Sequence, residues 1–315
     1  MGTGWNALAT AVHGAAGIAV VSLVPWKQAI VRAGLAKRWS ASMVGAVALA
    51  VLRGGALASG IVHVIGPRRV GDASLLGLDL AFLSVHVALA VLALPLLAWH
   101  VVARRGYLTP PDDARRRLLQ AGTLGAAAGA ATLALQVGSR LAPVGGDRRV
   151  TGSHELGTDD PAAMPVVQWF TDAVPSVDAS TWRLVVRAGG IDRRLGHGEL
   201  ADFVDANRAT LDCTRGWYAD QDWEGVRLAR LLPHDVRGRS VVVRSVTGYD
   251  RRFPLGDANR LLLATRVGGA ELSPGHGFPA RLVAPGRRGF WWVKWVEEVA
   301  VDDTPWWWQP PFPLQ

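Results

Sequence analysis

Five side chains that can carry positive charge are gathered in one short run of this 315-residue chain, HGFPARLVAPGRRGFWWVKW. An Arg guanidinium forks two phosphate oxygens, and a Lys ammonium supplies a compact point charge. Glycine and proline punctuate the run, as in a turn between strands. The run therefore predicts a site for a small, strongly anionic ligand. Its charged residues are His276, Arg281, Arg287, Arg288 and Lys294.

The only cysteine of the chain, Cys213, stands in a second segment, TLDCTRGWYADQDWEGVRLARLL. A thiolate is a suitable ligand for a soft metal centre. A lone cysteine is otherwise most often a buried structural thiol. With no second cysteine in the chain, Cys213 cannot form an internal disulfide. Both readings of Cys213 stay open on composition alone.

The two segments together resemble the cofactor-binding part of the sulfite oxidase superfamily, whose members carry molybdenum on a pyranopterin phosphate. The likeness spans roughly residues 182–301 and rests on the pattern HGFPxRxVxPGxxGxxxVKW and on a single Cys followed by Trp223, Gly225, Val226, Leu228 and Leu231. It implies that Cys213 ligates molybdenum and is catalytic. It also implies that the molybdopterin is held by His276, Arg281 and Lys294, with further contacts from Thr247 and Arg288.

Two departures from that pattern argue against sulfite as the substrate. Animal and plant sulfite oxidases have a tyrosine in a stretch reading Leu-Ala-Tyr, where this chain has Leu263-Ala264-Thr265. Relatives that oxidise sulfite also follow the ligand Cys with Asn and Arg, where this chain has Thr214-Arg215-Gly216-Trp217. The short form looks closer to the bacterial branch that includes methionine sulfoxide reductases.

The first 140 residues differ from the rest in being rich in Ala, Val, Leu and Gly. A helix needs about 20 apolar residues to cross a bilayer, and four runs approach or exceed that length. They predict a four-helix transmembrane domain over residues 1–140. The runs are Ala7–Val24, Ala41–Ile65, Leu80–Ala103 and Leu118–Val137.

The basic residues between these runs predict the topology. The first and third loops carry nine Lys and Arg, and the second carries only Arg68 and Arg69. Cytoplasmic loops are enriched in positive charge, so we expect the first and third loops in the cytoplasm. The C-terminal domain of this multi-pass cell-membrane protein then lies outside the cytoplasm. The excess of Arg thus indicates topology and a lipid partner rather than nucleic acid.

The fourth run begins with Ala114-Arg115-Arg116-Arg117-Leu118-Leu119-Gln120, which resembles a twin-arginine export signal. That route carries folded proteins, so it suits a protein that must receive its cofactor before export. An ordinary positively charged stop on the cytoplasmic side explains the same arginines. Both interpretations are retained.

Histidines in the apolar region suggest a second cofactor. His13 and His86 fall at similar depth on helices that run parallel, which makes them candidate axial ligands of one b haem. His63 is a rival ligand on the same side. His100 follows His86 by fourteen residues on the same helix face and could serve an inner site with Met43. The alternative is that these histidines are polar side chains with hydrogen-bond partners on neighbouring helices, which the sequence alone does not distinguish from haem ligands.

Residues 141–165 read as a linker and residues 166–315 as the molybdopterin-binding oxidoreductase domain. Short alternating segments predict an α+β domain with a mixed sheet. Strands are expected at Trp182–Arg187 and Ser240–Ser245, and helices at Glu199–Asn207 and Val226–Leu232. The aromatic run from Pro305 to Pro313 either enters the headgroup layer or caps the domain's own core.

These expectations combine into a membrane-anchored molybdopterin oxidoreductase that transfers an oxygen atom to or from a small-molecule substrate. Electrons would pass through a b haem to or from the quinone pool or another redox partner. In one alternative the helices are only an anchor for an active molybdenum domain. In the other, the chain is a non-catalytic binding or sensor module on the same scaffold.

Overall fold

A computed structural model of the chain describes residues 4–23, 41–65, 72–75, 78–104, 114–141, 149, 151–168 and 173–310. The chain divides into two compact units, Met1–His154 and Glu155–Gln315. The division falls inside the segment 141–165, for which the sequence predicts a linker. The later part of that segment joins the second unit, because the Leu156 and Asp159 amides donate to the Tyr218 and Asp220 carbonyls at 2.8 and 3.1 Å.

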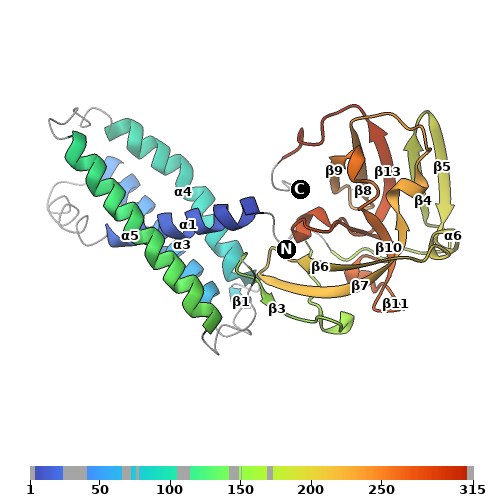
Figure 1. The fold of residues 1–315 in the computed structure, drawn as a ribbon, viewed down its shortest axis with the longest axis horizontal. Coiled ribbons are helices and arrows are strands. Elements are labelled where there is room, and N and C mark those ends of the chain that lie inside the picture. Colours follow the sequence, from blue (N-terminus) through green and yellow to red (C-terminus); the bar gives the residue numbers. More distant parts are fainter. Residues whose placement is uncertain are drawn as a thin grey trace. The chain divides into compact units, whose positions relative to one another are not determined.

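The four apolar runs of the first unit are helical, as the sequence predicts (Figure 1). Helix α3 packs along α4, and α1 packs along α5. A short hairpin, β1 (Asp72–Leu75) and β2 (Leu78–Ala81), precedes α4. The helices are α1 (Gly4–Ser22), α3 (Ala41–Ile65), α4 (Phe82–Arg104) and α5 (Ala114–Leu141).

Glycines on α3 allow the close approach of α4. A Cβ atom on Gly45 would clash with the Trp99 ring, and one on Gly60 would lie 2.9 Å from Nδ1 of His86. Small residues at such positions let helix backbones pack tightly. Large side chains of α4 therefore lie directly on the α3 backbone at these two positions.

A transmembrane bundle of four helices is not confirmed. Over the part of the chain that the structure describes, Met43–Val62 and Phe82–Ala103 are long and apolar enough to cross a bilayer. Ala11–Ser22 is apolar but shorter. The structure does not describe the side chains of Arg115, Arg116 and Arg117. The export-signal interpretation therefore stays a prediction from the sequence.

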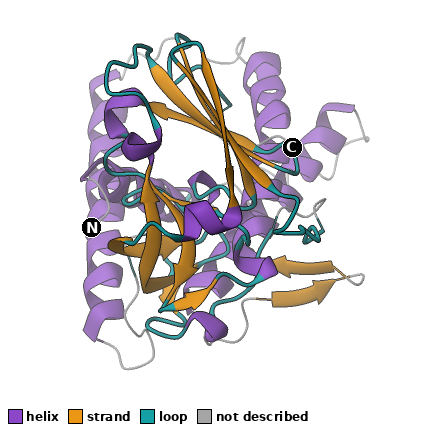
Figure 2. Cartoon of the chain, turned by 90° about the vertical axis from the view of Figure 1, so that its right-hand side faces the viewer, coloured by secondary structure: helices purple, strands orange, loops and turns teal. Residues whose placement is uncertain are grey.

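The second unit contains two β-sheets, and Figure 2 shows their strands in orange. In the first, β11–β10–β7–β3 are neighbours, β12 pairs with β10, and β6 pairs with β7. In the second, the order is β5–β4–β13–β8–β9, with β13 parallel to β4 and antiparallel to β8. The prediction of an α+β domain with a mixed sheet is confirmed. The strands are β3 (His154–Glu155), β4 (Arg183–Ala188), β5 (Ile191–Gly196), β6 (Asp205–Asp212), β7 (Trp217–Arg227), β8 (Ser240–Ser245), β9 (Asp250–Pro254), β10 (Leu262–Val267), β11 (Ala270–Glu271), β12 (Arg281–Val283) and β13 (Val296–Asp302).

The buried apolar residues described in this unit form one core. Alternate residues of β7 point inward, and Trp223 at its centre has no exposed surface. Its indole donates to the Ala209 carbonyl at 3.2 Å, so the buried N–H is satisfied. Burying one large apolar side chain contributes about 1.5–3 kcal/mol. Leu184, Phe253 and Leu282 are buried as completely.

Both predicted helices of this unit are shorter than expected. Helix α6 (His197–Ala201) ends before Asp205, and the residues from Asp205 onward form β6. There the pairing of β6 with β7 prevails over helix propensity, since it buries Ala209 and Leu211. Likewise Val226 belongs to β7, and helix α7 covers only Leu228–Leu231.

Candidate active site

Cys213 lies at the tight end of the β6–β7 hairpin. Its amide donates to the Trp217 carbonyl at 2.8 Å, and the Gly216 amide donates to the Cys213 carbonyl at 3.2 Å. Gly216 adopts a φ of +90°, which favours glycine. The Arg215 amide lies 3.5 Å from the Cys213 sulfur. The turn therefore fixes the thiol through backbone contacts on both sides.

Arg288 holds this hairpin in place. Its guanidinium donates to a carboxylate oxygen of Asp212 at 2.9 Å and to the Cys213 carbonyl at 3.1 Å. The neighbouring Gly289 allows the approach, because a Cβ there would lie 3.1 Å from the Cys213 Cα. The Arg288 side chain thus contacts the loop that carries the thiol. Its predicted contact with the cofactor stays a prediction.

His276 closes the short helix η4 (Pro274–His276) and is buried. Its Nδ1 lies 2.9 Å from the Ser273 hydroxyl, and its Nε2 lies 3.1 Å from the Met164 carbonyl. Burial, together with the nearby charge of Arg281, lowers the pKa of His276 to about 4. A neutral imidazole then donates from Nε2 and accepts at Nδ1, so both ring nitrogens already have protein partners.

Arg281 and Lys294 bring two buried positive charges to the same place. Arg281 donates to the His276 carbonyl at 3.1 Å and lies against the Trp223 and Trp292 rings. Lys294 donates to the Val167 and Gly275 carbonyls at 2.8 and 2.5 Å. Within the described residues, neither side chain forms an ion pair with a carboxylate.

The pKa values of both groups reflect this lack of counter-charge. Burial lowers the pKa of Arg281 to about 10. Burial and the charge of Arg281 lower the pKa of Lys294 to about 7. A buried cation without an oppositely charged group nearby is unfavourable. An anion placed between the two groups would restore the charged form of Lys294.

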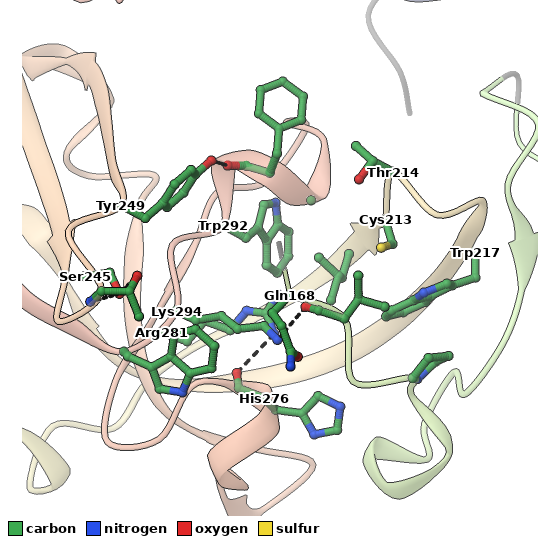
Figure 3. A pocket seen from close by; sticks show the side chains of 17 residues that line it. Gln168, Cys213, Thr214, Trp217, Ser245, Tyr249, His276, Arg281, Trp292 and Lys294 are labelled. Carbon is green, nitrogen blue, oxygen red and sulfur yellow. Dashed lines mark hydrogen bonds between the residues drawn. The ribbon is translucent and has the colours of Figure 1, made fainter. Parts of the chain in front are cut away.

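One cavity contains most of the residues that the sequence singles out. Cys213 and Trp217 lie on one side of it, and Arg281, Lys294 and His276 lie on another (Figure 3). Thr247 also lines it, with its hydroxyl 3.1 Å from that of Ser245. The structure therefore brings Cys213, Thr247, His276, Arg281 and Lys294 together around one space.

Other residues that the sequence did not single out also line the cavity, among them Gln168, Trp217 and Tyr249. Trp217 is buried, and its indole nitrogen has no hydrogen-bond partner in the described part of the chain. The position of Trp217, four residues after the only Cys, was an available signal. Gln168 and Tyr249 come from distant segments that carry no motif, so only the fold brings them here.

Opposing effects act on the thiol of Cys213. Burial raises its pKa, while the Arg215 amide and the charges of Arg288, Lys294 and Arg281 lower it. Burial has the largest influence, so the free thiol remains protonated at neutral pH. Binding of a metal would displace that proton, because the thiolate is the ligand form.

Comparison with known proteins identifies this domain. Residues 171–308 match the family described as oxidoreductase molybdopterin binding domain. A nitrate reductase (NADPH) from Phytophthora infestans is 42% identical over 72 residues, which are 23% of this chain and 7% of that protein. A nitrate reductase (NAD(P)H) from Hordeum vulgare is 24% identical over 205 residues, covering 49% of this chain and 23% of that protein.

Among solved structures, a chain of the sulfane dehydrogenase SoxCD from Paracoccus pantotrophus aligns with a TM-score of 0.38 and 23% identity, over 42% of this chain and 40% of that one. The present chain spans less than a quarter of the length of the nitrate reductases named above. Residues 171–308 are therefore similar to an oxidoreductase molybdopterin binding domain.

The residues in the cavity fit that cofactor. A pterin phosphate is an anion, and the two buried cations that lack a carboxylate partner line the cavity. The Nε of Arg281 is buried without a hydrogen-bond partner in the described residues, as expected of a donor that awaits a ligand. The single thiol of the chain opens onto the same space as these cations.

Proposed function

We propose that this protein is a membrane-anchored molybdopterin oxidoreductase that transfers an oxygen atom at a site outside the cytoplasm. The observation that carries the proposal is the meeting of Cys213, Arg281 and Lys294 around one cavity. Cys213 would be the protein ligand of molybdenum, and the two cations would hold the phosphate. Thr247 and His276 would lie beside the pterin.

The cofactor supplies two-electron redox chemistry when it is bound. The reaction balances when a substrate X=O takes up two protons and two electrons to give X and water, or when the reverse occurs. The protein's residues hold and orient the reactants. The aromatic rings of Trp217, Phe290 and Trp292 in the cavity wall would limit the access of water to the bound cofactor.

Membrane anchoring is supported by the surface of helices α3 and α4. Val51, Val91 and Leu94 are exposed on them, while the small residues Ala56 and Ala93 are buried. Large apolar side chains that point outward suit a lipid surrounding. The nine basic residues in the first and third loops, against two in the second, support an extracytoplasmic C-terminal domain.

A b haem between His13 and His86 would connect the site to the membrane. The two imidazole rings lie with their centroids 5.6 Å apart. Nδ1 of His86 lies 2.7 Å from the Ala56 carbonyl. A histidine that ligates a metal commonly donates its other ring N–H to a carbonyl. With Nδ1 as the donor, Nε2 of His86 keeps its lone pair for iron.

The remaining candidates in the first unit are less determined. His100 lies on α4 and is half-buried, and Met43 is half-buried on α3. His63 belongs to α3, but its side chain lies outside the described side chains. The second haem, the quinone pool as electron partner and the lipid contacts remain parts of the proposal.

Metal and haem analysis of the purified full chain tests the proposal. We expect one molybdenum and one pterin per chain, together with a b-type band in the reduced-minus-oxidised absorbance spectrum. If the chain carries molybdenum but shows no haem band, the helices serve only as a membrane anchor. A chain without molybdenum, purified from cells that make the cofactor, would refute the proposal.

A further inference from the structure

The aromatic segment after β13 folds back on the edge of the five-stranded sheet. Gln309 accepts a hydrogen bond from the Arg252 amide at 3.1 Å and donates to the Arg252 carbonyl at 2.8 Å. Strand β9 is the edge of this sheet, so these two backbone groups would otherwise have no ladder partner. One glutamine side chain thus replaces a further strand at Arg252.

The three tryptophans of this segment divide into two kinds. The Trp306 ring lies 5.5 Å from the guanidinium of Arg287. Trp307 and Trp308 are 59% and 71% exposed. Trp306 and Gln309 therefore attach the segment to the domain, whereas Trp307 and Trp308 take no comparable part.

Arg251 connects this segment to the cavity wall. It is only 2% exposed, and its NH1 donates to the Pro310 carbonyl at 3.0 Å. Its Nε donates to the Tyr249 hydroxyl at 2.9 Å, and Tyr249 in turn donates to the Phe290 carbonyl. Both Tyr249 and Phe290 line the cavity. A continuous set of contacts therefore leads from the C-terminal segment to the cofactor site.

Three aromatic rings surround the buried charge of Arg251. The guanidinium lies 5.4, 5.2 and 5.5 Å from the ring centroids of Tyr249, Phe290 and Trp291. The faces of aromatic rings attract a cation, but burying an ion without a hydrogen-bonding partner is unfavourable. The contact with the Pro310 carbonyl therefore also matters. Loss of that contact would leave the guanidinium free to shift, and Tyr249 and Phe290 with it.

We propose that the segment from Trp306 to Pro310 is a brace for the cofactor cavity and that Arg251 is the positioning residue through which it acts. Gln309 holds the segment on β9, and the Pro310 carbonyl then holds Arg251. Arg251 fixes Tyr249 and Phe290 in the cavity wall. The part of this inference that concerns cofactor retention rests on the proposed function. The part that concerns Tyr249 does not.

Fluorine NMR tests the brace without the cofactor. The chain has three tyrosines, so 3-fluorotyrosine gives three signals, and Tyr249→Phe identifies one of them. In cofactor-free full-length protein, Gln309→Ala and Arg251→Met should each shift or broaden the Tyr249 signal. Trp308→Ala, in the same segment but exposed, should leave it in place. A Tyr249 signal that is unchanged in both Gln309→Ala and Arg251→Met would overturn the brace.

Cofactor release tests the consequence for the site. Pterin should leave loaded Gln309→Ala protein about tenfold faster than wild type, the equivalent of one hydrogen bond to a charged group. Leu195→Ala, which opens the core at the other edge of the sheet, controls for general destabilisation. Equal acceleration in Leu195→Ala at equal loss of Tm would assign the segment a merely structural role. Wild-type protein that holds no pterin would refute the proposed function, while the NMR result would still decide the brace.

Discussion

The two units of the chain place their large apolar side chains in opposite ways. In the second unit, Trp223, Phe253 and Leu282 have no exposed surface, and strands cover them from several sides. In the first unit, the described buried apolar residues are Leu49 and three alanines, while Val51 and Leu94 face outward with more than half of their surface exposed. The second unit shields its own apolar core from water. The exposed apolar side chains of the first unit support the proposed membrane anchor.

The difference also extends to the polar groups of each unit. The second unit buries Arg251, Arg281 and His276 around or beside one cavity. In the first unit, the exposed His13 ring lies 5.6 Å from the ring of the half-buried His86, which contacts the Ala56 carbonyl. The comparison therefore predicts two cofactor sites that can be lost one at a time.

The largest effect should follow from Cys213→Ala. The variant should lose its molybdenum and all oxygen-atom transfer, because the chain holds no second thiol to replace the ligand. Metal analysis of purified protein measures the loss, and the haem spectrum should remain as in wild type. Thr214→Ala, at the exposed neighbouring position, is the matched control and should keep its metal. Full molybdenum occupancy in Cys213→Ala would exclude the thiol as ligand.

His86→Ala should abolish the b-type haem band while molybdenum content stays at the wild-type level. Removal of one axial imidazole leaves the iron without its sixth ligand, and the Ala56 carbonyl loses its partner. His13→Ala should remove the same band. Optical spectra of membranes from cells supplied with haem precursor provide the measurement. His63→Ala serves as the comparison. If the haem band is lost in His63→Ala but kept in His13→Ala, His63 and not His13 is the axial ligand opposite His86.

Arg288→Ala should destabilise the second unit by about 2 kcal/mol, the size of a hydrogen bond to a charged group. The change leaves the buried carboxylate of Asp212 without its guanidinium partner and frees the hairpin that carries Cys213. Chemical unfolding followed by tryptophan fluorescence measures the loss. The double variant with Asp212→Ala should be less destabilised than the sum of the single variants. Strict additivity would instead favour a direct phosphate contact for Arg288.

The smallest effect should be a pH dependence of anion binding. Burial lowers the pKa of Lys294 to about 7, well below the ordinary value of about 10.4. The charged form prevails below this pKa and disappears as the pH rises through it. Sulfate, whose charge is constant over this range, should bind cofactor-free protein up to about tenfold more weakly at pH 8 than at pH 6. Calorimetry on Lys294→Met should give a flat profile, and a flat profile in wild type would contradict the lowered pKa.

The sequence predicts the site better than it predicts the fold around it. The two motifs predicted that Cys213, Arg281 and Lys294 belong to one site, and all three side chains line one cavity. Residues Asp205–Asn207 read as helix because their local propensity is ambiguous. Their strand state depends on pairing with β7, which lies up to twenty residues away. Propensity cannot show such non-local pairing.

Individual roles within the site were also hidden from sequence. Arg288 belongs to the same basic run as Arg281, yet its guanidinium turns to Asp212 and the Cys213 carbonyl. The motif does not specify where each guanidinium points, because both arginines fit it equally well. Tyr249 and Gln168 reach the cavity only through the tertiary fold. In the first unit, the length of the apolar runs predicted four membrane-spanning helices. Two of the described helices are both long enough and apolar enough to cross a bilayer.

The order of strands in the five-stranded sheet has a consequence for the timing of synthesis. Strand β13 lies between β4 and β8 and is translated after both of them. At about 5–20 residues per second, a ribosome needs roughly 6 to 24 s to pass from Arg183 to Asp302. During that interval the β4–β5 and β8–β9 hairpins have no common strand to join them. Because Lys294 comes directly before β13, the ribosome completes the cofactor cavity and the sheet within the same few residues, and loading with the cofactor must follow that moment.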